Sequence, residues 1–273
     1  MWKGETVSVI LPTYNEKDSI QACINQFQAT GYVDEIVVVN NNASPGTSDE
    51  VAPTSAREVH ESRQGYGAAI RRGFEEVTGH YIVVCEPDGT FDAHDVVKLF
   101  AYARDFDLVL GSRTVKEFIW QGANMGHFLK WGNYAVAKMM EMLFDTVSLT
   151  DIGCTMRLIK RPALELMQPL FTINDNYFGP EMMLLACILD IPMVQIPVNY
   201  QARIGESSVT GNKWKALKLG LRMIEMILSY KWRTDGIRRK SRLKRRSATP
   251  IPADKATATA TIPVVDSADS RNP

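Results

Sequence analysis

Two acidic side chains follow an apolar run in the segment VVCEPDGTF, which spans residues 83–91. Glu86 and Asp88 lie one residue apart, with a Pro between them and a Gly and a Thr after them. Two carboxylates at the end of a buried strand could hold a hard cation such as Mg²⁺ or Mn²⁺, which takes oxygen ligands from few carboxylates and from substrate phosphate. The alternative is an acidic turn on a solvated rim of the sheet.

The cysteines and histidines give no sign of a zinc site or a disulfide framework. The cysteines lie far apart without a CxxC pair, at Cys23, Cys85, Cys154 and Cys187. The histidines show no spacing typical of a metal site and lie at His60, His80, His94 and His127. Reduced thiols are therefore expected, as in cytosolic proteins.

Short β-branched runs alternate with helical patterns along most of the chain. Strands are predicted at residues 7–11, 35–40, 57–61, 81–85, 107–111 and 194–200. Helices are predicted at residues 16–29, 67–78, 93–104, 126–144, 161–168, 176–189 and 212–232. Strands that lack alternation are typical of a parallel sheet covered by helices on both faces. The sequence therefore predicts a single α/β domain with a mostly parallel sheet and a Rossmann-like first half.

Polar residues come directly after two of the predicted strands. Asn40–Asn42 end the second strand, and Glu86 and Asp88 follow the fourth. Ligands of open α/β sheets bind beyond the carboxyl ends of the strands. This shared position favours a binding site over an ordinary turn.

The composition is that of a globular protein, with 45% hydrophobic and 23% charged residues and no net charge over 273 residues. The charge is unevenly distributed, because residues 1–230 carry 20 basic and 27 acidic side chains whereas residues 231–246 carry nine basic ones and one acidic one. A short basic segment on an acidic body suggests an anionic partner. We expect no nucleic-acid partner.

The last part of the sequence has a different character from the rest. Residues 233–273 begin with the basic run and continue as a low-complexity segment rich in Ala, Thr and Pro. Such a segment lacks the apolar content that offsets the entropy of ordering, so disorder is expected. The predicted domain therefore spans residues 1–232, and its last helix is residues 212–232.

No targeting or membrane-spanning segment is predicted. The first residues, MWKGETVSVILPTYNE, are unlike a signal peptide because their apolar run is short and strand-like. No stretch of about 18 uncharged apolar residues is present, so no transmembrane helix is expected.

Seven segments in order resemble family-two glycosyltransferases of the GT-A fold, in particular the dolichol- and polyprenyl-phosphate sugar synthases. Their order and spacing match that family over roughly residues 5–210. The segments are VSVILPTYNE (7–16), EIVVVNNNASPGT (35–47), RQGYGAAIRRGF (63–74), VVCEPDGTF (83–91), DLVLGSR (107–113), LTDIGCTMRLIKR (149–161) and IPVNYQARIGESS (196–208).

The resemblance implies a single-displacement, inverting transfer of a hexose from a nucleoside-diphosphate sugar, assisted by a divalent cation. Glu86 and Asp88 occupy the position of the family's acidic metal motif, with Glu in place of the more usual first Asp. The leaving nucleoside diphosphate develops negative charge, which Mg²⁺ or Mn²⁺ can neutralise. Both residues are therefore expected to bind the metal and the donor, and Asp88 is a candidate catalytic residue.

By the same resemblance, the segment PTYNE should hold the nucleotide. Pro12 would fix the turn after the first strand, Tyr14 could face the base, and Glu16 could accept from donor hydroxyls or from the base. The alternative is a helix start, because Asn15 can cap a helix and Glu16 suits a first turn.

Asn40 is a candidate donor-binding residue at a position where the family commonly carries Asp. An Asp only accepts hydrogen bonds, whereas an Asn can accept or donate. The base therefore remains open between GDP and UDP, as does any effect of the substitution on activity. The alternative for residues 40–42 is a loop that tolerates left-handed backbone.

The segment GYGAAIRRG opens a predicted helix and could bind phosphate at the helix N-terminus. In the family it packs beside the donor, so Arg71 is a candidate donor-binding residue. Close packing around the glycines, with a solvated Arg72, explains the segment equally well.

Three arginines lie at family positions where cations meet phosphates, and Arg suits forked contacts with phosphate. Arg113 and Arg203 are assigned to the donor, Arg113 also to catalysis, and Arg157 to the acceptor. Each could instead be an ordinary surface residue. Ser207 lies in the segment RIGESS, which resembles a mobile flap over the donor.

Asp151 is the candidate polar partner near the acceptor. A hydroxyl acceptor would need a general base. A phosphate acceptor has its second pKa near ~6 and is largely ionised at neutral pH, so Asp151 would then only position other groups. The preceding helical span is rich in aromatic residues and Met, and in it Trp131 is assigned to an apolar acceptor such as a lipid tail.

The helix predicted at residues 212–232 has apolar side chains at three- and four-residue steps and several lysines in its first half. With the basic run behind it, this pattern indicates an amphipathic helix at a membrane surface. A helix packed on its own domain or in a dimer is the alternative.

These observations favour a cytoplasmic hexosyltransferase, peripheral at the inner face of the membrane, that uses a lipid phosphate of the polyprenyl type as acceptor. One alternative keeps the donor chemistry but uses a soluble acceptor. Another is a catalytically lapsed nucleotide-sugar-binding protein, which the Asn residues at 40–42 motivate.

Overall fold

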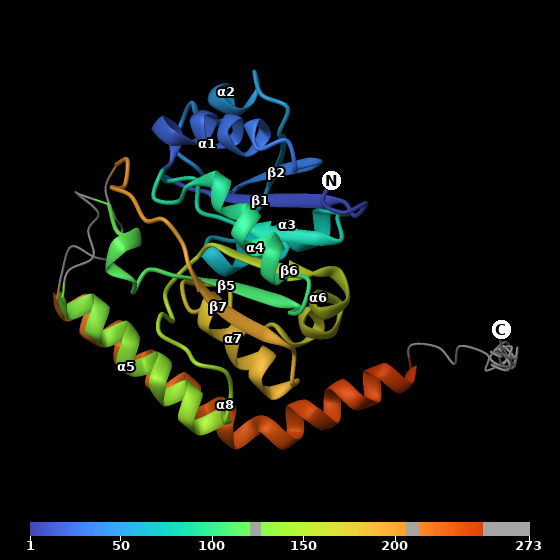
Figure 1. The fold of residues 1–273 in the computed structure, drawn as a ribbon, viewed down its shortest axis with the longest axis vertical. Coiled ribbons are helices and arrows are strands. Elements are labelled where there is room, and N and C mark those ends of the chain that lie inside the picture. Colours follow the sequence, from blue (N-terminus) through green and yellow to red (C-terminus); the bar gives the residue numbers. More distant parts are fainter. Residues whose placement is uncertain (121–126, 206–212, 248–273) are drawn as a thin grey trace, which may run out of the picture.

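The computed structural model describes residues 1–120, 127–205 and 213–247. Within them a seven-stranded sheet has the order β3-β2-β1-β4-β6-β5-β7 (Figure 1). The strands are β1 (Val7–Thr13), β2 (Glu35–Asn40), β3 (Arg57–His60), β4 (Tyr81–Val84), β5 (Leu108–Ser112), β6 (Arg157–Lys160) and β7 (Met193–Pro197). The predicted α/β class with a mostly parallel sheet is confirmed.

Helices connect most of the strands and cover the sheet. The α-helices are α1 (Lys17–Ala29), α2 (Thr47–Val51), α3 (Tyr66–Glu76), α4 (Val96–Tyr102), α5 (His127–Phe144), α6 (Arg161–Met167), α7 (Phe178–Ile188) and α8 (Lys213–Ser247). Short 3₁₀ turns occur at η1 (Ala93–Asp95), η2 (Lys116–Phe118) and η3 (Gln168–Leu170). The predicted helix at residues 93–104 is therefore divided into η1 and α4.

Strand β6 interrupts the parallel arrangement, because it runs antiparallel to both of its neighbours, β4 and β5. The sequence analysis did not predict this strand, which has only four residues and begins with a charged one, Arg157. The remaining paired strands are parallel to their neighbours. Strands β1, β2, β4 and β5 consequently end at one edge of the sheet, here called the carboxyl edge.

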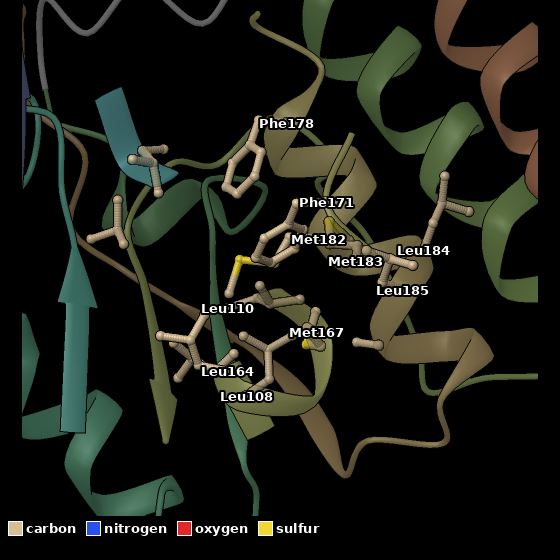
Figure 2. Close-up of a cluster of buried hydrophobic side chains, with 14 of the residues drawn as sticks. Leu108, Leu110, Leu164, Met167, Phe171, Phe178, Met182, Met183, Leu184 and Leu185 are labelled. Atoms are coloured by element: carbon tan, nitrogen blue, oxygen red, sulfur yellow. The ribbon is translucent and has the colours of Figure 1, made fainter. Parts of the chain in front are cut away.

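Alternate residues of β1 face two separate layers of the core. Ile10 packs in a cluster with Phe74 of α3 and Phe178 of α7, whereas Leu11 packs in a second cluster with Ile24 of α1 and Phe100 of α4. Both faces are apolar, which explains why β1 shows no alternation in its sequence. Figure 2 shows the first cluster, in which aromatic, Leu and Met side chains fill the space between α7 and the strands.

The last helix, α8, is longer than predicted: it continues past residue 232 to Ser247. Ile237 packs against the core, Ser241 is buried, and Arg238 Nε donates to the Ile188 carbonyl at 2.8 Å. The expected end of the helix at residue 232 is therefore wrong, because the first part of the basic run has contacts that hold it as helix. The domain boundary expected at that residue remains a prediction. The disorder expected for residues 248–273 lies outside the described residues.

Helix α8 is attached to the domain through a buried carboxylate. Glu181 of α7 is fully buried and accepts from the Tyr230 hydroxyl at 2.5 Å, from Thr172 N at 2.8 Å and from Ile173 N at 3.1 Å. Met223 and Ile227 of α8 are buried on the same side of the helix. One face of this helix is therefore packed on its own domain, which is the alternative to a helix at a membrane surface.

Helix α5 and the first part of α8 lie side by side (Figure 1). Several large apolar side chains of the pair stay exposed: Trp131, Tyr134, Met142, Leu221, Leu228 and Trp232. In the part of the chain that the structure describes, no helix has the length and apolarity needed to cross a bilayer.

Candidate functional site

The two acidic side chains of the segment 83–91 lie at the carboxyl edge, directly after β4. Asp88 is buried, and its Oδ1 accepts from Thr90 N at 3.0 Å and from Thr90 Oγ1 at 2.6 Å. Gly89 has a φ of +77°, and a Cβ there would lie 3.0 Å from the Ile204 side chain. The turn therefore needs Gly both for its left-handed backbone and for its close approach to a neighbouring segment.

Arg203 connects the ends of two strands. Its Nη1 lies 3.0 Å from Asp88 Oδ2, and its Nη2 lies 3.0 Å from Glu16 Oε1. The main chain of its segment is also held there, because Ile204 N donates to the Asp88 carbonyl at 2.9 Å. The structure thus brings together Glu16, Asp88 and Arg203, which are far apart in the sequence.

Glu86 differs from Asp88 because its carboxylate accepts no hydrogen bond from the described residues. Burial, with the Asp88 charge as a second cause, raises the pKa of Glu86 to about 8. Within the described residues the Glu86 oxygens are therefore available as ligands of a divalent cation beside Asp88.

The donor set fits a cation that a substrate completes. Among residues 1–120, 127–205 and 213–247, no cluster of three or more His, Cys, Asp or Glu side chains could hold a metal ion by itself. Mg²⁺ is commonly bound by one or two carboxylates together with substrate phosphates. Glu86 and Asp88, as hard oxygen donors, match that mode of binding.

The segment after β1 forms a tight turn into α1. Glu16 Oε2 accepts from Tyr14 N at 2.7 Å and from Asn15 N at 2.9 Å, whereas Asn15 makes no side-chain cap of the helix. Tyr14 is 46% exposed, so its ring is open to a ligand. The role predicted for Pro12 is wrong: Pro12 lies inside β1, which continues to Thr13, and the turn begins after it.

The three consecutive Asn residues join the turn after β2 to the loop after β3. Asn41 Nδ2 donates to the carbonyls of Glu61 and Arg63, each at 2.8 Å, and its Oδ1 accepts from Gly65 N at 2.8 Å. Asn42 has a φ of 56°, as expected for a loop with left-handed backbone. Asn40 is buried at the end of β2.

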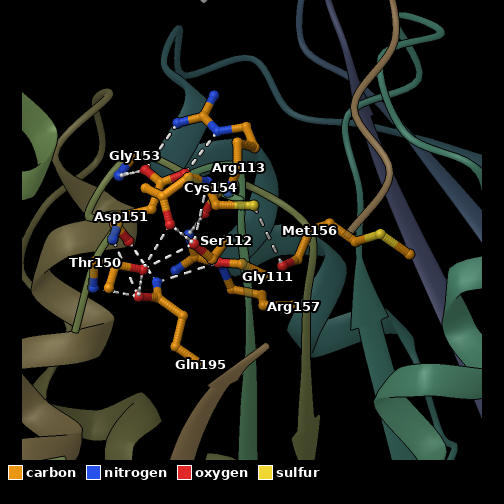
Figure 3. A network of polar contacts seen from close by, with 11 residues as sticks. Gly111, Ser112, Arg113, Thr150, Asp151, Gly153, Cys154, Met156, Arg157 and Gln195 are labelled. Atoms are coloured by element: carbon orange, nitrogen blue, oxygen red, sulfur yellow. Dashed lines mark hydrogen bonds and ion pairs between the residues drawn. The ribbon is translucent and has the colours of Figure 1, made fainter. Parts of the chain in front are cut away.

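Arg113 and Asp151 form a forked ion pair at the end of β5 (Figure 3). Arg113 Nε and Nη2 donate to Asp151 Oδ2 and Oδ1 at 2.8 and 3.0 Å, and Arg113 N donates to Oδ2 at 3.0 Å. Gly153 N donates to Oδ1 at 2.9 Å. These contacts outweigh burial, so the pKa of the Asp151 carboxyl lies below its usual range. Asp151 is therefore unsuited to act as a general base.

A second ring of contacts holds this pair in place. Gln195 Oε1 accepts from Thr150 N at 2.6 Å and from Asp151 N at 3.0 Å, and Gln195 Nε2 donates to the Asp151 carbonyl at 2.6 Å. The Arg113 guanidinium also lies 5.2 Å from the centre of the Tyr200 ring. The sequence analysis named neither Gln195 nor Tyr200, because contacts across 40 or more residues leave no local pattern.

The structure holds two other predicted arginines by contacts within the domain. Arg157 is buried, and its guanidinium donates to the carbonyls of Gly179 at 3.1 Å and Cys154 at 2.5 Å. Arg71 Nη1 donates to Asn174 Oδ1 at 2.8 Å. Contacts of Arg157 with the acceptor and of Arg71 with the donor remain predictions.

The glycine-rich segment that opens α3 is packed against the loop before α7. A Cβ at Gly65 would lie 2.1 Å from the Asn174 carbonyl oxygen, and one at Gly67 would lie 2.7 Å from Phe178 Cβ. Close packing thus explains these glycines. Between them, Tyr66 has a buried hydroxyl with no hydrogen-bond partner among the described residues.

Two predicted residues remain, Trp131 and Ser207. Trp131 is on α5 and is 67% exposed. Ser207 lies outside the described residues, so its predicted contact with the donor remains a prediction.

Comparison with known proteins identifies the family of the chain. Residues 8–167 match the family model described as glycosyl transferase family 2. The low-salt glycan biosynthesis hexosyltransferase Agl6 of Haloferax volcanii is 30% identical over 209 residues, which are 75% of this chain and 50% of that protein. An uncharacterized glycosyltransferase of Mycobacterium tuberculosis is 38% identical over 111 residues, which are 40% of this chain and 50% of that protein. The chain thus spans about half the length of these relatives.

Solved structures share the fold. Glucosyl-3-phosphoglycerate synthase from Mycobacterium tuberculosis, in complex with Mn²⁺, UDP and glucosyl-3-phosphoglycerate, has a TM-score of 0.63 and 19% identity; the match covers 83% of this chain and 80% of that chain. Its complex with Mg²⁺ and UDP has a TM-score of 0.64 and 18% identity, over 83% and 79% of the two chains. The expected GT-A fold is confirmed, and with a family model matched over more than half of its length the chain belongs to glycosyl transferase family 2.

Proposed function

We propose that this protein is an inverting, metal-dependent hexosyltransferase that uses a nucleoside-diphosphate sugar as donor and a polyprenyl-phosphate-type lipid as acceptor. The observation that carries the proposal is the cluster of Glu16, Glu86, Asp88 and Arg203 at the carboxyl edge. The similarity to Agl6, a hexosyltransferase of glycan biosynthesis, supports a hexose as the transferred sugar.

In this proposal Glu86 and Asp88 hold Mg²⁺ or Mn²⁺, which would neutralise the charge that develops on the leaving diphosphate. The complexes of glucosyl-3-phosphoglycerate synthase with UDP and either Mn²⁺ or Mg²⁺ support this assignment. Arg203 faces carboxylates in the protein alone, and its forked guanidinium suits the phosphates of the donor. Tyr14 and Asn40 would face the base at the ends of β1 and β2.

The form of the Arg113–Asp151 pair favours a phosphate acceptor. Asp151 has four hydrogen bonds and a lowered pKa, so it is a poor base for a hydroxyl. A phosphate with its second pKa near ~6 needs no base at neutral pH. In this proposal Asp151 positions Arg113, and the positive charge of Arg113 binds the acceptor phosphate. An oxygen of that phosphate then attacks the anomeric carbon of the donor sugar.

The exposed side of the α5–α8 pair supports a lipid acceptor and a membrane surface. Trp131 and Met142 of α5, and Leu221 and Trp232 of α8, are all more than half exposed. Basic side chains on α8, among them Arg222 and Lys231, are exposed on the same helix. Large apolar side chains next to basic ones are typical of helices that lie in a membrane interface.

A soluble phosphorylated acceptor is the second candidate. The observation behind it is that glucosyl-3-phosphoglycerate synthase, which shares the fold, forms a complex with Mn²⁺, UDP-glucose and phosphoglyceric acid. Arg113 would serve a soluble phosphate as well as a lipid phosphate. The α5–α8 surface would then have another role.

The test is a comparison of acceptors with one donor and Mg²⁺ or Mn²⁺ present. We expect transfer to a short-chain prenyl phosphate and none to the matching prenyl alcohol, because Asp151, the carboxylate beside Arg113, is held by four hydrogen bonds and is a poor base for the alcohol. If phosphoglyceric acid were the only acceptor that is glycosylated, the soluble acceptor would take the place of the lipid in this proposal. Binding of the donor without transfer to any acceptor would indicate the catalytically lapsed alternative.

A further inference from the structure

The Asn40 side chain is held on both of its ends. Its Nδ2 donates to Glu58 Oε1 at 2.7 Å, and its Oδ1 accepts from Ala43 N at 2.8 Å. Glu58 comes from the neighbouring strand β3, and its Oε1 also accepts from Ser48 Oγ at 2.8 Å. The Glu58 carboxylate is therefore fixed in place beside the Asn40 amide.

These two contacts allow only one orientation of the amide. Rotation by half a turn would place Oδ1 against the Glu58 carboxylate and Nδ2 against the Ala43 N–H. Both new contacts would join groups of the same kind, two acceptors or two donors, so neither could form a hydrogen bond. The nitrogen of Asn40 is thus occupied, whereas its carbonyl oxygen, which has two lone pairs, keeps one to offer.

Asn40 lies at the carboxyl edge beside an exposed aromatic residue. Tyr14, with its exposed ring, follows β1, and β1 pairs with β2 up to Thr13 and Asn40. Ser44 N donates to the Tyr14 carbonyl at 2.7 Å, so the turn after β2 lies against the turn after β1. An aromatic face beside one recessed acceptor can stack on a base and read one N–H group.

We propose that Glu58 is a positioning residue that makes Asn40 a hydrogen-bond acceptor, so that the donor nucleotide carries a base with a ring N–H, such as uracil or guanine. This inference rests on the proposed function. Uracil and guanine both have a ring N–H on their pairing edge. Cytosine and adenine have an unprotonated ring nitrogen there, which would face the Asn40 oxygen without a proton between them.

The same contact explains why an amide stands at this position. An Asp at residue 40 would place a second carboxylate within hydrogen-bond distance of Glu58, and two such charges repel each other. Asn40 keeps the acceptor of an Asp but replaces its second oxygen by a donor to Glu58. A carboxylate at residue 40 should therefore be tolerated only together with a neutral side chain at residue 58.

The first experiment measures binding of UDP, GDP, CDP and ADP to the full chain with Mg²⁺ by calorimetry. We expect UDP, GDP or both to bind about tenfold or more tightly than CDP and ADP, because a mispaired acceptor costs the mismatched base its hydrogen bond. Equal binding of all four would overturn the inference and leave the proposed function intact. Binding of none would overturn the proposed function, and the inference with it.

The second experiment tests Glu58 with a double-mutant cycle. Asn40→Asp alone should lower the melting temperature by roughly 2–4 °C and weaken UDP or GDP binding about tenfold. Adding Glu58→Gln should restore both the melting temperature and the affinity. It should also keep the preference over CDP, because the carboxylate introduced by Asn40→Asp only accepts hydrogen bonds. As a matched control, Asn40→Asp with Glu75→Gln has the same net charge, but Glu75 is exposed on α3, so no recovery is expected.

The outcome of the cycle separates positioning from simple stability. Recovery of the melting temperature without recovery of the base preference would overturn the role of Glu58 in recognition. Equal recovery by Glu58→Gln and Glu75→Gln would show that total charge matters rather than this contact, and would overturn the inference as well.

Discussion

Two arginine–aspartate pairs at the carboxyl edge differ in how firmly they are held. Asp151 and Arg113 have 0% and 13% of their side chains exposed and meet in a forked contact with further main-chain donors. Arg203 is 26% exposed and divides its guanidinium between Asp88 and Glu16 by single contacts. The first pair has the form of a fixed part of the fold. The second has the form of a contact that a ligand can replace.

The largest expected effect is on stability, from breaking the fixed pair. Asp151→Asn leaves the buried Arg113 charge without its counterion, so we expect a loss of about 3–5 kcal/mol in the free energy of unfolding, measured by denaturant titration. Asp105→Asn is the matched control, because Asp105 is 72% exposed beside Arg104, and such pairs contribute about 0–1 kcal/mol. Equal losses in the two variants would contradict the distinction between the pairs.

Breaking the other pair should affect activity rather than stability. Asp88→Asn removes a proposed metal ligand, so we expect transfer to fall roughly hundred- to thousandfold, about 2.7–4 kcal/mol of transition-state stabilisation. The free energy of unfolding should change much less than in Asp151→Asn, because Arg203 keeps Glu16 as a partner. Full activity of Asp88→Asn in the presence of EDTA would rule out the metal assignment.

Replacing each arginine by lysine sharpens the comparison. Arg203→Lys should weaken nucleotide binding roughly tenfold, about 1.4 kcal/mol, because Lys lacks the forked contact with phosphate, and should leave the melting temperature nearly unchanged. Arg113→Lys should lower the melting temperature, because it loses one of the two parallel bonds to Asp151. Thermal melts and calorimetry on both variants test this reversal.

The pH dependence of stability should separate the carboxylates at this edge. The pKa of Glu86 is raised to about 8, so the folded protein binds its proton more tightly than the unfolded chain. Stability should therefore fall as pH rises from about 5 to 8 in EDTA, by at most about 1.4 kcal/mol per pH unit. Glu86→Gln should flatten this slope.

Asp151 should respond in the opposite direction and in another pH range. Its pKa is lowered from 3.8, so its contribution is complete above that value and is lost as pH falls below it. Asp151→Asn should therefore change the acid limb of the stability curve and leave the slope between pH 5 and 8 unchanged. A change in that slope instead would show that the two carboxylates have been assigned the wrong environments.

The sequence predicted the strands that bear the site and the location of its acidic residues. The runs that became β1, β2, β4 and β5 are apolar and bounded by turn residues, so local pattern determined them. Strand β6 is short and begins with Arg157, and a charged residue is not expected in a buried strand. The sequence pattern therefore did not predict it. The second half of α8 was missed because a charge run gives no sign of the contacts that Ile237 makes with the core.

The partners of the site residues were harder to predict than the residues themselves. Glu86 and Asp88 are recognisable from their spacing, but nothing local links Asp88 to Arg203 or Asn40 to Glu58. Arg157 shows the opposite case. Its segment matches the family, but its guanidinium donates to carbonyls within the domain. A residue type indicates what chemistry is possible, and only the fold decides which partner meets it.

The attachment of α8 through Glu181 has a mechanical consequence. Tyr230 meets this carboxylate, which also holds Thr172 and Ile173, and the next residue, Asn174, binds Ala68 N at 2.9 Å and Arg71. Displacing α8 from α7 would leave buried polar groups unpaired, at about 1–3 kcal/mol each. These contacts therefore couple the position of α8 to that of the glycine-rich segment that opens α3. In the proposed membrane-bound state, the tilt of α8 would therefore also set the tilt of this segment relative to the membrane.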